Sequence, residues 1–300
     1  MTTNKKLFVV VGPTASGKTD VAFQLAQHLK TEIVSADSRQ VYIELGVGAN
    51  KPPGQYLDAI PHHFINHVSI FEKYTAGDYG LECRQLLEDL FTKYDTVVMV
   101  GGSGLYIHSA IYGLDPLPQV PKHIRHYLET LLITKGLEHL VNMLKEKDPD
   151  ALNIVDIKNP PRVIRALEVC LHTGKPYSQF LSSFRKDKPI IPYHIIWLGI
   201  LTDRQRLYKR INERVDQMVF RGLIEEARLW YPYNHLYALR SHGYQEFFPF
   251  FAGRYSSTKA IELVKRNTRR YAKRQYTWFK RYPVKWLPKE EVVPYALSLL

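Results

Sequence analysis

Four short apolar runs divide the chain, and helical patterns lie between them. In three of these runs most residues are hydrophobic and do not alternate with polar ones, which is typical of parallel strands buried on both faces. In the intervening segment 80–93, leucines recur at helical spacing among charged residues. This order of elements predicts an α/β protein with a parallel sheet flanked by helices. The predicted strands cover residues 7–11, 32–37, 95–100 and 194–201.

The middle of the chain has a different pattern. Residues 114–121 contain three prolines, which indicates a linker. From there to about residue 184 the spacing of apolar residues is helical, without a strand pattern, and further prolines mark a second hinge. The sequence therefore predicts a catalytic core formed by residues 1–117 and 190–300, and an all-helical insertion domain at 118–189.

A glycine-rich turn joins the first strand to a helix expected at about 19–30. It reads G-x-x-x-x-G-K-T from Gly12 to Thr19. In such a phosphate-binding loop (P-loop), backbone N–H groups converge on phosphate oxygens, the lysine adds a positive charge, and the threonine hydroxyl can ligate Mg²⁺. A chance match is the alternative, but the flanking strand and helix meet the structural requirement of the motif. The residues predicted to bind a diphosphate or nucleotide are Gly12, Pro13, Thr14, Ala15, Ser16, Gly17, Lys18 and Thr19.

The second predicted strand ends in a carboxylate, Asp37. Because ligands of open α/β sheets bind beyond the carboxyl ends of the strands, we expect Asp37 at the same edge of the sheet as Lys18. Three roles are open for it: a metal-associated acid, a general base, or a cap for a turn that begins at Ser38. The neighbouring pair His62-His63 has no third ligand at a suitable spacing. We interpret these histidines as structural or as part of an acceptor site.

The charge of the chain narrows the choice of partner. Its 41 Lys and Arg against 29 Asp and Glu give a net charge of +12, which favours a polyanion such as nucleic acid. A helix predicted at 264–282 has eight Lys and Arg, no acid and interleaved aromatic residues, which favours contact with nucleic acid. A helix that closes over bound phosphate is the alternative. The two cysteines lack metal-binding spacing and no apolar run could cross a bilayer, so we expect a cytoplasmic protein without a membrane partner.

Two arginines lie one helical turn apart, Arg210 and Arg214, in a helix expected from 203 to about 230. Two cations on one face suit a diphosphate leaving group. Glu213 beside them offers the alternative of ordinary surface salt bridges. The pattern alone leaves both interpretations open.

Several short motifs follow one another along nearly the whole chain. They are GPTASGKT at 12–19, SADSRQVY at 35–42, PHHF at 61–64, VGGSGLY at 100–106, PRVIRALEV at 161–169, TGKP at 173–176, HGYQE at 242–246 and AKRQYTWF at 272–279. Together they resemble the bacterial tRNA dimethylallyltransferase (isopentenylpyrophosphate transferase) family, and their co-occurrence is far more specific than any single motif. The chain departs from the family at 43–52, where a segment like RGMDIGTAKP is expected and an Arg, an Asp and a Thr are missing.

The resemblance implies a P-loop NTPase-like fold and a specific reaction. A dimethylallyl group would move from dimethylallyl diphosphate to N6 of the adenosine 3′-adjacent to the anticodon, giving N6-(dimethylallyl)adenosine in the anticodon stem-loop of tRNA. Asp37 would accept the N6 proton. Lys18, Mg²⁺ on Thr19, and Arg214, which matches the family's diphosphate-side arginine, would stabilise the leaving diphosphate. The positions expected to contact tRNA are Asp37, Ser38, Arg39, Gln40, Ser103, Arg125, Pro161, Arg162, Val163, Ile164 and Arg165.

Two other classes of protein are open from the sequence. A P-loop small-molecule or nucleotide kinase would use the same loop for ATP and Asp37 to activate a hydroxyl, but it leaves the basic helix unexplained. A nucleotide-dependent RNA-binding module without chemistry explains the charge but not the carboxylate at the edge of the sheet. We expect the transferase, acting as a monomer with tRNA and dimethylallyl diphosphate as its partners.

Overall fold

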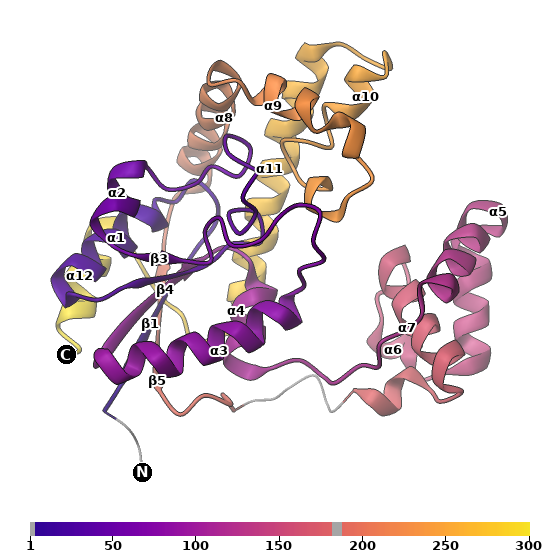
Figure 1. The fold of residues 1–300 in the computed structure, drawn as a ribbon, viewed down its shortest axis with the longest axis horizontal. Helices are drawn as coiled ribbons and strands as arrows, with labels where there is room; N and C mark the ends of the chain where they lie inside the picture. Colours follow the sequence, from indigo (N-terminus) through magenta and orange to yellow (C-terminus); the bar gives the residue numbers. More distant parts are fainter. Residues whose placement is uncertain (1–3, 182–187) are drawn as a thin grey trace. The chain divides into compact units, whose positions relative to one another are not determined.

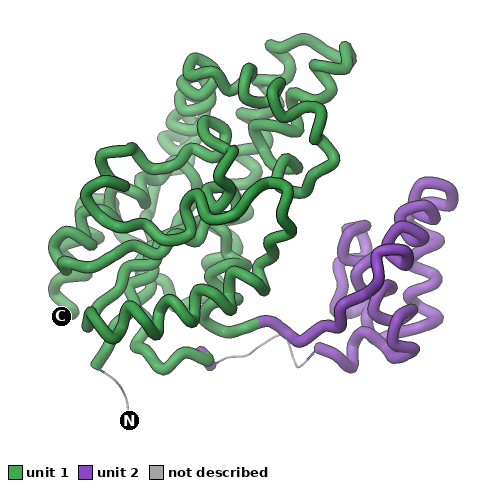
Figure 2. The backbone as a smooth tube through the Cα atoms, viewed as in Figure 1, with its two compact units in different colours: residues 1–113, 190–300 green, residues 114–189 purple. Residues whose placement is uncertain are grey.

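The structure of the chain is a computed structural model that describes residues 4–181 and 188–300 (Figure 1). Residues 182–187 of the expected insertion domain lie outside the described part. Two compact units make up the chain: residues 1–113 together with 190–300 form the first, and 114–189 form the second (Figure 2). No helix of the described residues combines the length and apolar character needed to cross a membrane.

The first unit is built on one parallel sheet. Its strands are β1 Lys6–Val11, β2 Ile33–Ala36, β3 His62–His63, β4 Thr96–Gly101, β5 His194–Ile200 and β6 Lys285–Leu287. They lie in the order β3-β2-β4-β1-β5-β6, and every pair is parallel. The chain leaves β1 toward β2 on one side and leaves β4 toward β5 on the other, so a ligand site is expected at the carboxyl ends of β1 and β4. The four predicted strands are confirmed, whereas β3 and β6 are too short to give an apolar pattern.

Both faces of the sheet are buried, which explains the continuous apolar runs. Along β1, Leu7, Val9 and Val11 contribute to one hydrophobic core, whereas Phe8 and Val10 contribute to another. The second, smaller core is closed by α1 (Lys18–Leu29) and α12 (Lys289–Leu297). The larger core is covered mainly by three helices: α3 Ala76–Lys93, α4 Gly104–Tyr112 and α11 Ser257–Phe279.

The prediction of a single helix from 203 to about 230 is wrong, because the structure has two helices there. α8 (Arg204–Phe220) begins after Asp203, whose carboxylate accepts two backbone N–H groups at 2.9 and 3.0 Å. α9 (Leu223–Leu229) follows Gly222, whose φ of 95° is easy only for glycine and breaks the helix. The other short helices of this unit are α2 Gly54–Ala59, α10 Phe248–Phe251, and the 3₁₀ turns Tyr231–Tyr233 and Tyr237–Leu239.

The second unit is helical throughout its described part. It consists of α5 Lys122–Lys147, α6 Ala151–Ile154, α7 Pro160–Thr173 and the 3₁₀ turn Tyr177–Phe180. These helices enclose a hydrophobic core of their own. The unit begins at residue 114, whereas the sequence placed the boundary at 118, because the proline-rich linker is assigned to this unit. The structure thus separates an α/β unit, which holds the P-loop, from a helical unit inserted before β5.

Candidate active site

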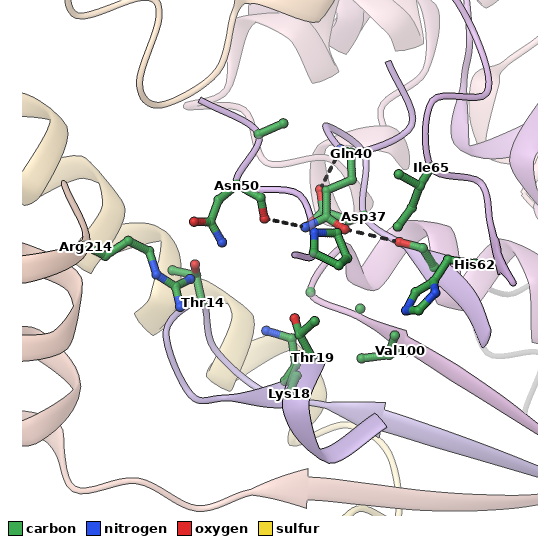
Figure 3. A pocket seen from close by; sticks show the side chains of 15 residues that line it. Thr14, Lys18, Thr19, Asp37, Gln40, Asn50, His62, Ile65, Val100 and Arg214 are labelled. Carbon is green, nitrogen blue, oxygen red and sulfur yellow. Dashed lines mark hydrogen bonds between the residues drawn. The ribbon is translucent and has the colours of Figure 1, made fainter. Parts of the chain in front are cut away.

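A pocket lies at the carboxyl ends of β1, β2 and β4 (Figure 3). It brings together four side chains that the sequence predicted at one site: Lys18, Thr19, Asp37 and Arg214. They come from the start of α1, the turn after β2, and α8. The other residues that line the pocket are Thr14, Ser35, Gln40, Ala49, Asn50, Pro52, His62, Ile65, Val100, Gly101 and Gly102.

The P-loop between β1 and α1 is folded into a tight cradle. The backbone N–H of Ser16 and the ammonium of Lys18 both donate to the carbonyl oxygen of Pro13, at 3.2 and 3.0 Å. Gly17 has a φ of 94°, and a Cβ at this position would meet the side chain of Lys289 at 3.0 Å. Lys18 and Thr19, the first residues of α1, line the pocket. The N-terminus of this helix, which carries the positive end of the helix dipole, therefore borders the pocket.

Two partly buried cations, Lys18 and Arg214, make the pocket suitable for a polyanion. Burial lowers the pKa of Lys18 from 10.5 to about 8, while the charge of Asp37 opposes this shift and that of Arg214 adds to it. Burial also lowers the pKa of Arg214, against the influence of Asp20. With a pKa of about 8, Lys18 is mostly protonated at pH 7, and guanidinium groups as a class keep their charge in proteins. A diphosphate in the pocket would compensate for their lost hydration and their mutual repulsion.

Asp37 caps a turn and faces the pocket at the same time. Its Oδ1 accepts the backbone N–H groups of Arg39 and Gln40, at 2.9 and 3.3 Å, so the capping interpretation describes part of its role. No helix begins here; residues 38–41 form a turn. Both bonds use Oδ1, which leaves Oδ2 available to a substrate. Capping and chemistry are therefore compatible at this carboxylate.

The two arginines of α8 have different environments. Arg214 lines the pocket and is half-buried, whereas Arg210 is exposed on the helix surface. Glu213 lies 3.9 Å from Lys209, so the salt bridge that the structure describes at Glu213 does not use Arg214. The structure thus places Arg214, rather than the pair, beside the P-loop.

The segment that departs from the family, at 43–52, forms a wall of the pocket. Ala49, Asn50 and Pro52 line it, and the side-chain amide of Gln40 donates to the carbonyl oxygen of Asn50 at 2.9 Å. The sequence did not identify Asn50 as a site residue, because the missing motif residues gave no positive signal.

The same segment is held from outside by Glu226 of α9. Its carboxylate accepts the backbone N–H groups of Val47 and Gly48, at 2.7 and 3.0 Å, and also bonds the Tyr244 hydroxyl. A Cβ at Gly48 would lie 2.3 Å from the Tyr244 ring, so the segment packs there only with glycine. Tyr244 belongs to the HGYQE motif, which gives this motif a supporting role in the structure.

The residues expected on the acceptor side form a connected group next to Asp37. The Ser103 hydroxyl accepts the backbone N–H of Ser38 at 2.9 Å and lies 3.1 Å from the Ser38 hydroxyl. The guanidinium of Arg39 donates to the carbonyl oxygen of Ala238 at 2.9 Å and lies 5.5 Å from the Tyr237 ring centre. Tyr237, which the sequence did not single out, is largely exposed there.

In the helical unit, the predicted tRNA-binding residues have several kinds of surroundings. Arg125 and Arg165 lie 3.2 and 3.3 Å from the carboxylate of Glu168, which is buried. Val163 and Ile164 have side chains in the core of the unit, so they contribute packing there. Pro161 and Arg162 are exposed in the first turn of α7. Their contact with tRNA stays a prediction.

The cations of the basic helix α11 are partly paired inside the unit and partly exposed. Lys265 pairs with Asp216 of α8 at 2.5 Å, and Arg269 donates to Asn212 at 2.6 Å, so part of its charge is used inside the unit. Its buried face reaches the pocket through Gln275. The cations at or just beyond this helix that are exposed are Lys259, Arg266, Arg270, Lys273, Arg274, Lys280 and Arg281.

The pocket's donors fit Mg²⁺ better than a softer metal. No group of three or more His, Cys, Asp or Glu able to hold a metal occurs among the described residues. Mg²⁺ is commonly held by one or two protein oxygens together with substrate phosphates and water, and the hydroxyl of Thr19 and the carboxylate of Asp37 both line the pocket. His62 and His63 bond the carbonyl oxygen of Ile60 and the Glu32 carboxylate instead, at 2.7 and 2.6 Å.

The lowered pKa of Lys18 predicts a pH dependence. As the pH rises through about 8 the free site loses its ammonium charge, so the affinity for inorganic diphosphate should weaken by up to about tenfold per pH unit above that value. Isothermal titration calorimetry from pH 6.5 to 9.5 measures it. Lys18→Arg is the control, since its guanidinium stays protonated while the ligand titrates identically. Parallel pH curves for the two proteins would contradict the assignment of Lys18.

The profile of the IPP transferase family matches residues 40–282. The chain is 46% identical over 286 residues to the tRNA dimethylallyltransferase of Christiangramia forsetii, covering 95% of this chain and 94% of that one. It is 44% identical over 290 residues to that of Cytophaga hutchinsonii, covering 96% and 94%.

Solved structures agree with these relatives. The full-length tRNA isopentenylpyrophosphate transferase of Bacillus halodurans superimposes with a TM-score of 0.71 at 32% identity, covering 98% of this chain and 96% of that one. A eukaryotic dimethylallyltransferase acting on tRNA gives 0.76 at 26% identity, covering 98% and 78%. With a P-loop, a carboxylate and an arginine around one pocket, and with similarity over nearly its full length, the chain belongs to the IPP transferase family.

Proposed function

We propose that this chain is a tRNA dimethylallyltransferase, which transfers a dimethylallyl group from its diphosphate to N6 of the adenosine 3′-adjacent to the anticodon. The observation that carries the proposal is that two cations and one carboxylate, Lys18, Arg214 and Asp37, line one pocket at the carboxyl edge of the sheet. The two cations would bind the negatively charged diphosphate, and the carboxylate would accept a proton from the amine. Relatives of this family that match nearly the whole chain carry the same activity in their names.

The donor side is assigned to the P-loop. The N–H groups of the loop, the ammonium of Lys18 and the guanidinium of Arg214 would bind the diphosphate and stabilise the negative charge that it gains as the C–O bond breaks. Thr19 would hold Mg²⁺, which when bound shares this charge. A pocket that already contains both cations needs little reorganisation during the reaction.

The acceptor side is assigned to Asp37 and the turn beside it. The exocyclic amine of adenine must lose a proton as the new C–N bond forms, and Asp37 would accept it through Oδ2, since Oδ1 accepts the two backbone N–H groups of the turn. The target base must leave its stack to reach a pocket at the edge of a sheet, which is the general solution for chemistry on a base. Ser38, Arg39, Gln40 and Ser103 surround Asp37 and are proposed to position the flipped adenosine.

The proposal extends to the partner and the cell compartment. The anticodon stem-loop is the proposed part of tRNA that binds, with the exposed cations of α11 and the arginines of the helical unit as phosphate contacts. A cytoplasmic, monomeric enzyme belongs to the same proposal. The kinase alternative uses the P-loop equally well, but the relatives carry the name of a transferase and the basic faces would have no use.

Replacing Asp37 by Asn tests the general base. Asn keeps the shape and can still cap the turn and accept a hydrogen bond, but it cannot take the proton. Single-turnover transfer at saturating tRNA and dimethylallyl diphosphate should slow by about 10² or more, with nearly unchanged dissociation constants.

The matched control is Asp203→Asn, which makes the same change at the cap of α8 and should transfer at the parent rate. If Asp37→Asn transferred within about threefold of the parent, Asp37 would be a cap without a catalytic role.

Removing one exposed arginine tests the helical unit. If Arg162 binds a tRNA phosphate, Arg162→Ala should reduce the slope of log affinity against log salt by about 0.7 to 0.9. Filter binding of unmodified tRNA between 50 and 300 mM KCl (roughly the range in which phosphate contacts weaken measurably) gives the slope. Lys93→Ala is the control. Lys93 is exposed at the end of α3, just before β4, so it lies near the amino ends of the strands, whereas the pocket lies at their carboxyl ends. An unchanged slope for Arg162→Ala would remove this arginine from the interface.

A further inference from the structure

One motif of the chain, AKRQYTWF at 272–279, contains a buried amide that the proposed reaction does not use. Gln275 lies on the inner face of α11 and is only 5% exposed. It does not line the pocket itself. A buried amide must have hydrogen-bond partners, and the partners of Gln275 come from two different parts of the pocket.

The amide of Gln275 joins the donor loop to the acceptor turn. Its Oε1 accepts the backbone N–H of Thr14 in the P-loop at 2.8 Å, and its Nε2 donates to the carbonyl oxygen of Gly102 at 2.9 Å. Thr14 and Gly102 both line the pocket. The carbonyl oxygen of an amide can only accept hydrogen bonds and its NH₂ group can only donate them. The two bonds therefore fix the orientation of the amide and tie two lining segments to one side chain.

The surroundings of Gln275 leave little freedom. A Cβ at Gly102 would lie 2.1 Å from its Nε2, so the turn approaches the amide as closely as glycine permits. One helical turn earlier, the Tyr271 side chain lies close to the side chains of Gln275 and Ser103. Ser103 in turn contacts Ser38 next to Asp37. The amide is thus packed against both halves of the site.

We propose that Gln275 is a positioning residue that sets the separation between the P-loop and the turn at Gly102–Ser103, and thereby between the donor's reacting carbon and the acceptor amine. This inference rests on the proposed function, since it concerns the geometry of the same transfer. Displacement at carbon requires the nucleophile and leaving group in line, and an error of about 1 Å can cost roughly 10²-fold in rate. Ligand affinity depends on each half separately and is affected less.

The helix that carries Gln275 also has exposed cations on its outer side. Arg270, Lys273 and Arg274 lie in the same two turns as Gln275 and are exposed. RNA bound at these cations would contact the helix whose inner face holds both halves of the pocket. Gln275 therefore connects a basic surface of the first unit with two segments that line the pocket.

The experiment compares two variants that remove different parts of the connection. Gln275→Met has nearly the same shape but neither hydrogen bond, whereas Gln275→Glu keeps an acceptor for Thr14 and loses the donor to Gly102. We expect single-turnover transfer to fall at least about tenfold in both, with dissociation constants for tRNA and dimethylallyl diphosphate within about threefold of the parent. Gln217→Met, on the exposed surface of α8, is the matched control and should match the parent.

Each variant is assayed below its own melting temperature, and if Gln275→Met does not fold, Gln275→Glu decides the question. The proposal is overturned if the folded variants transfer within about threefold of the parent. It is also overturned if Gln275→Glu alone is unimpaired, since one bond would then suffice, or if the loss lies wholly in donor affinity. Failure of the parent itself to transfer a dimethylallyl group would instead contradict the proposed function.

Discussion

The proposed chemistry depends on one geometric constraint: parallel strands of a single sheet all end at the same edge. β1 carries the P-loop there, β2 carries Asp37, and β4 carries the Gly102–Ser103 turn. A cation and a carboxylate that are far apart along the chain thereby line one buried pocket. Burial gives this arrangement its effect, because the pKa of Lys18 falls to about 8 when water is removed from around it. The cations of the pocket are therefore positioned by the fold as a whole and not by the P-loop alone.

Three helices around the pocket each contribute a different residue to the pocket or to its support. α8 supplies Arg214, α9 supports the 43–52 segment through Glu226, and α11 reaches both the P-loop and the acceptor turn through Gln275. Several of these helices are also basic on their outer surfaces, so the elements that shape the pocket carry the charge that favours RNA. α8 and α11 thus combine residues that contribute to the pocket or its support with exposed cations on their outer surfaces.

The strands and the P-loop were predictable because their signals are local. Leu7 to Val11 are apolar without interruption since both faces of β1 are covered, and the spacing from Gly12 to Thr19 is set by the phosphate. Asp37 followed from its place at a strand end. The bridge from Thr14 to Gln275 joins residues 261 positions apart, and only the tertiary structure brings them together. The place of Asn50 in the pocket was missed because the segment 43–52 lacks the family's motif residues and so gave no signal. The end of α8 could have been predicted by giving more weight to Gly222, which separates it from α9.

The central claim is that the P-loop serves prenyl transfer. The most direct measurement gives the enzyme unmodified tRNA, dimethylallyl diphosphate labelled with ¹⁴C at its first carbon, and ATP labelled with ³²P in its γ-phosphate, in one reaction. The account predicts that ¹⁴C enters the tRNA at an adenine N6 in equal amount to the inorganic diphosphate released, and that no ³²P is transferred. Transfer of ³²P to an acceptor, with no ¹⁴C in the tRNA, would contradict it.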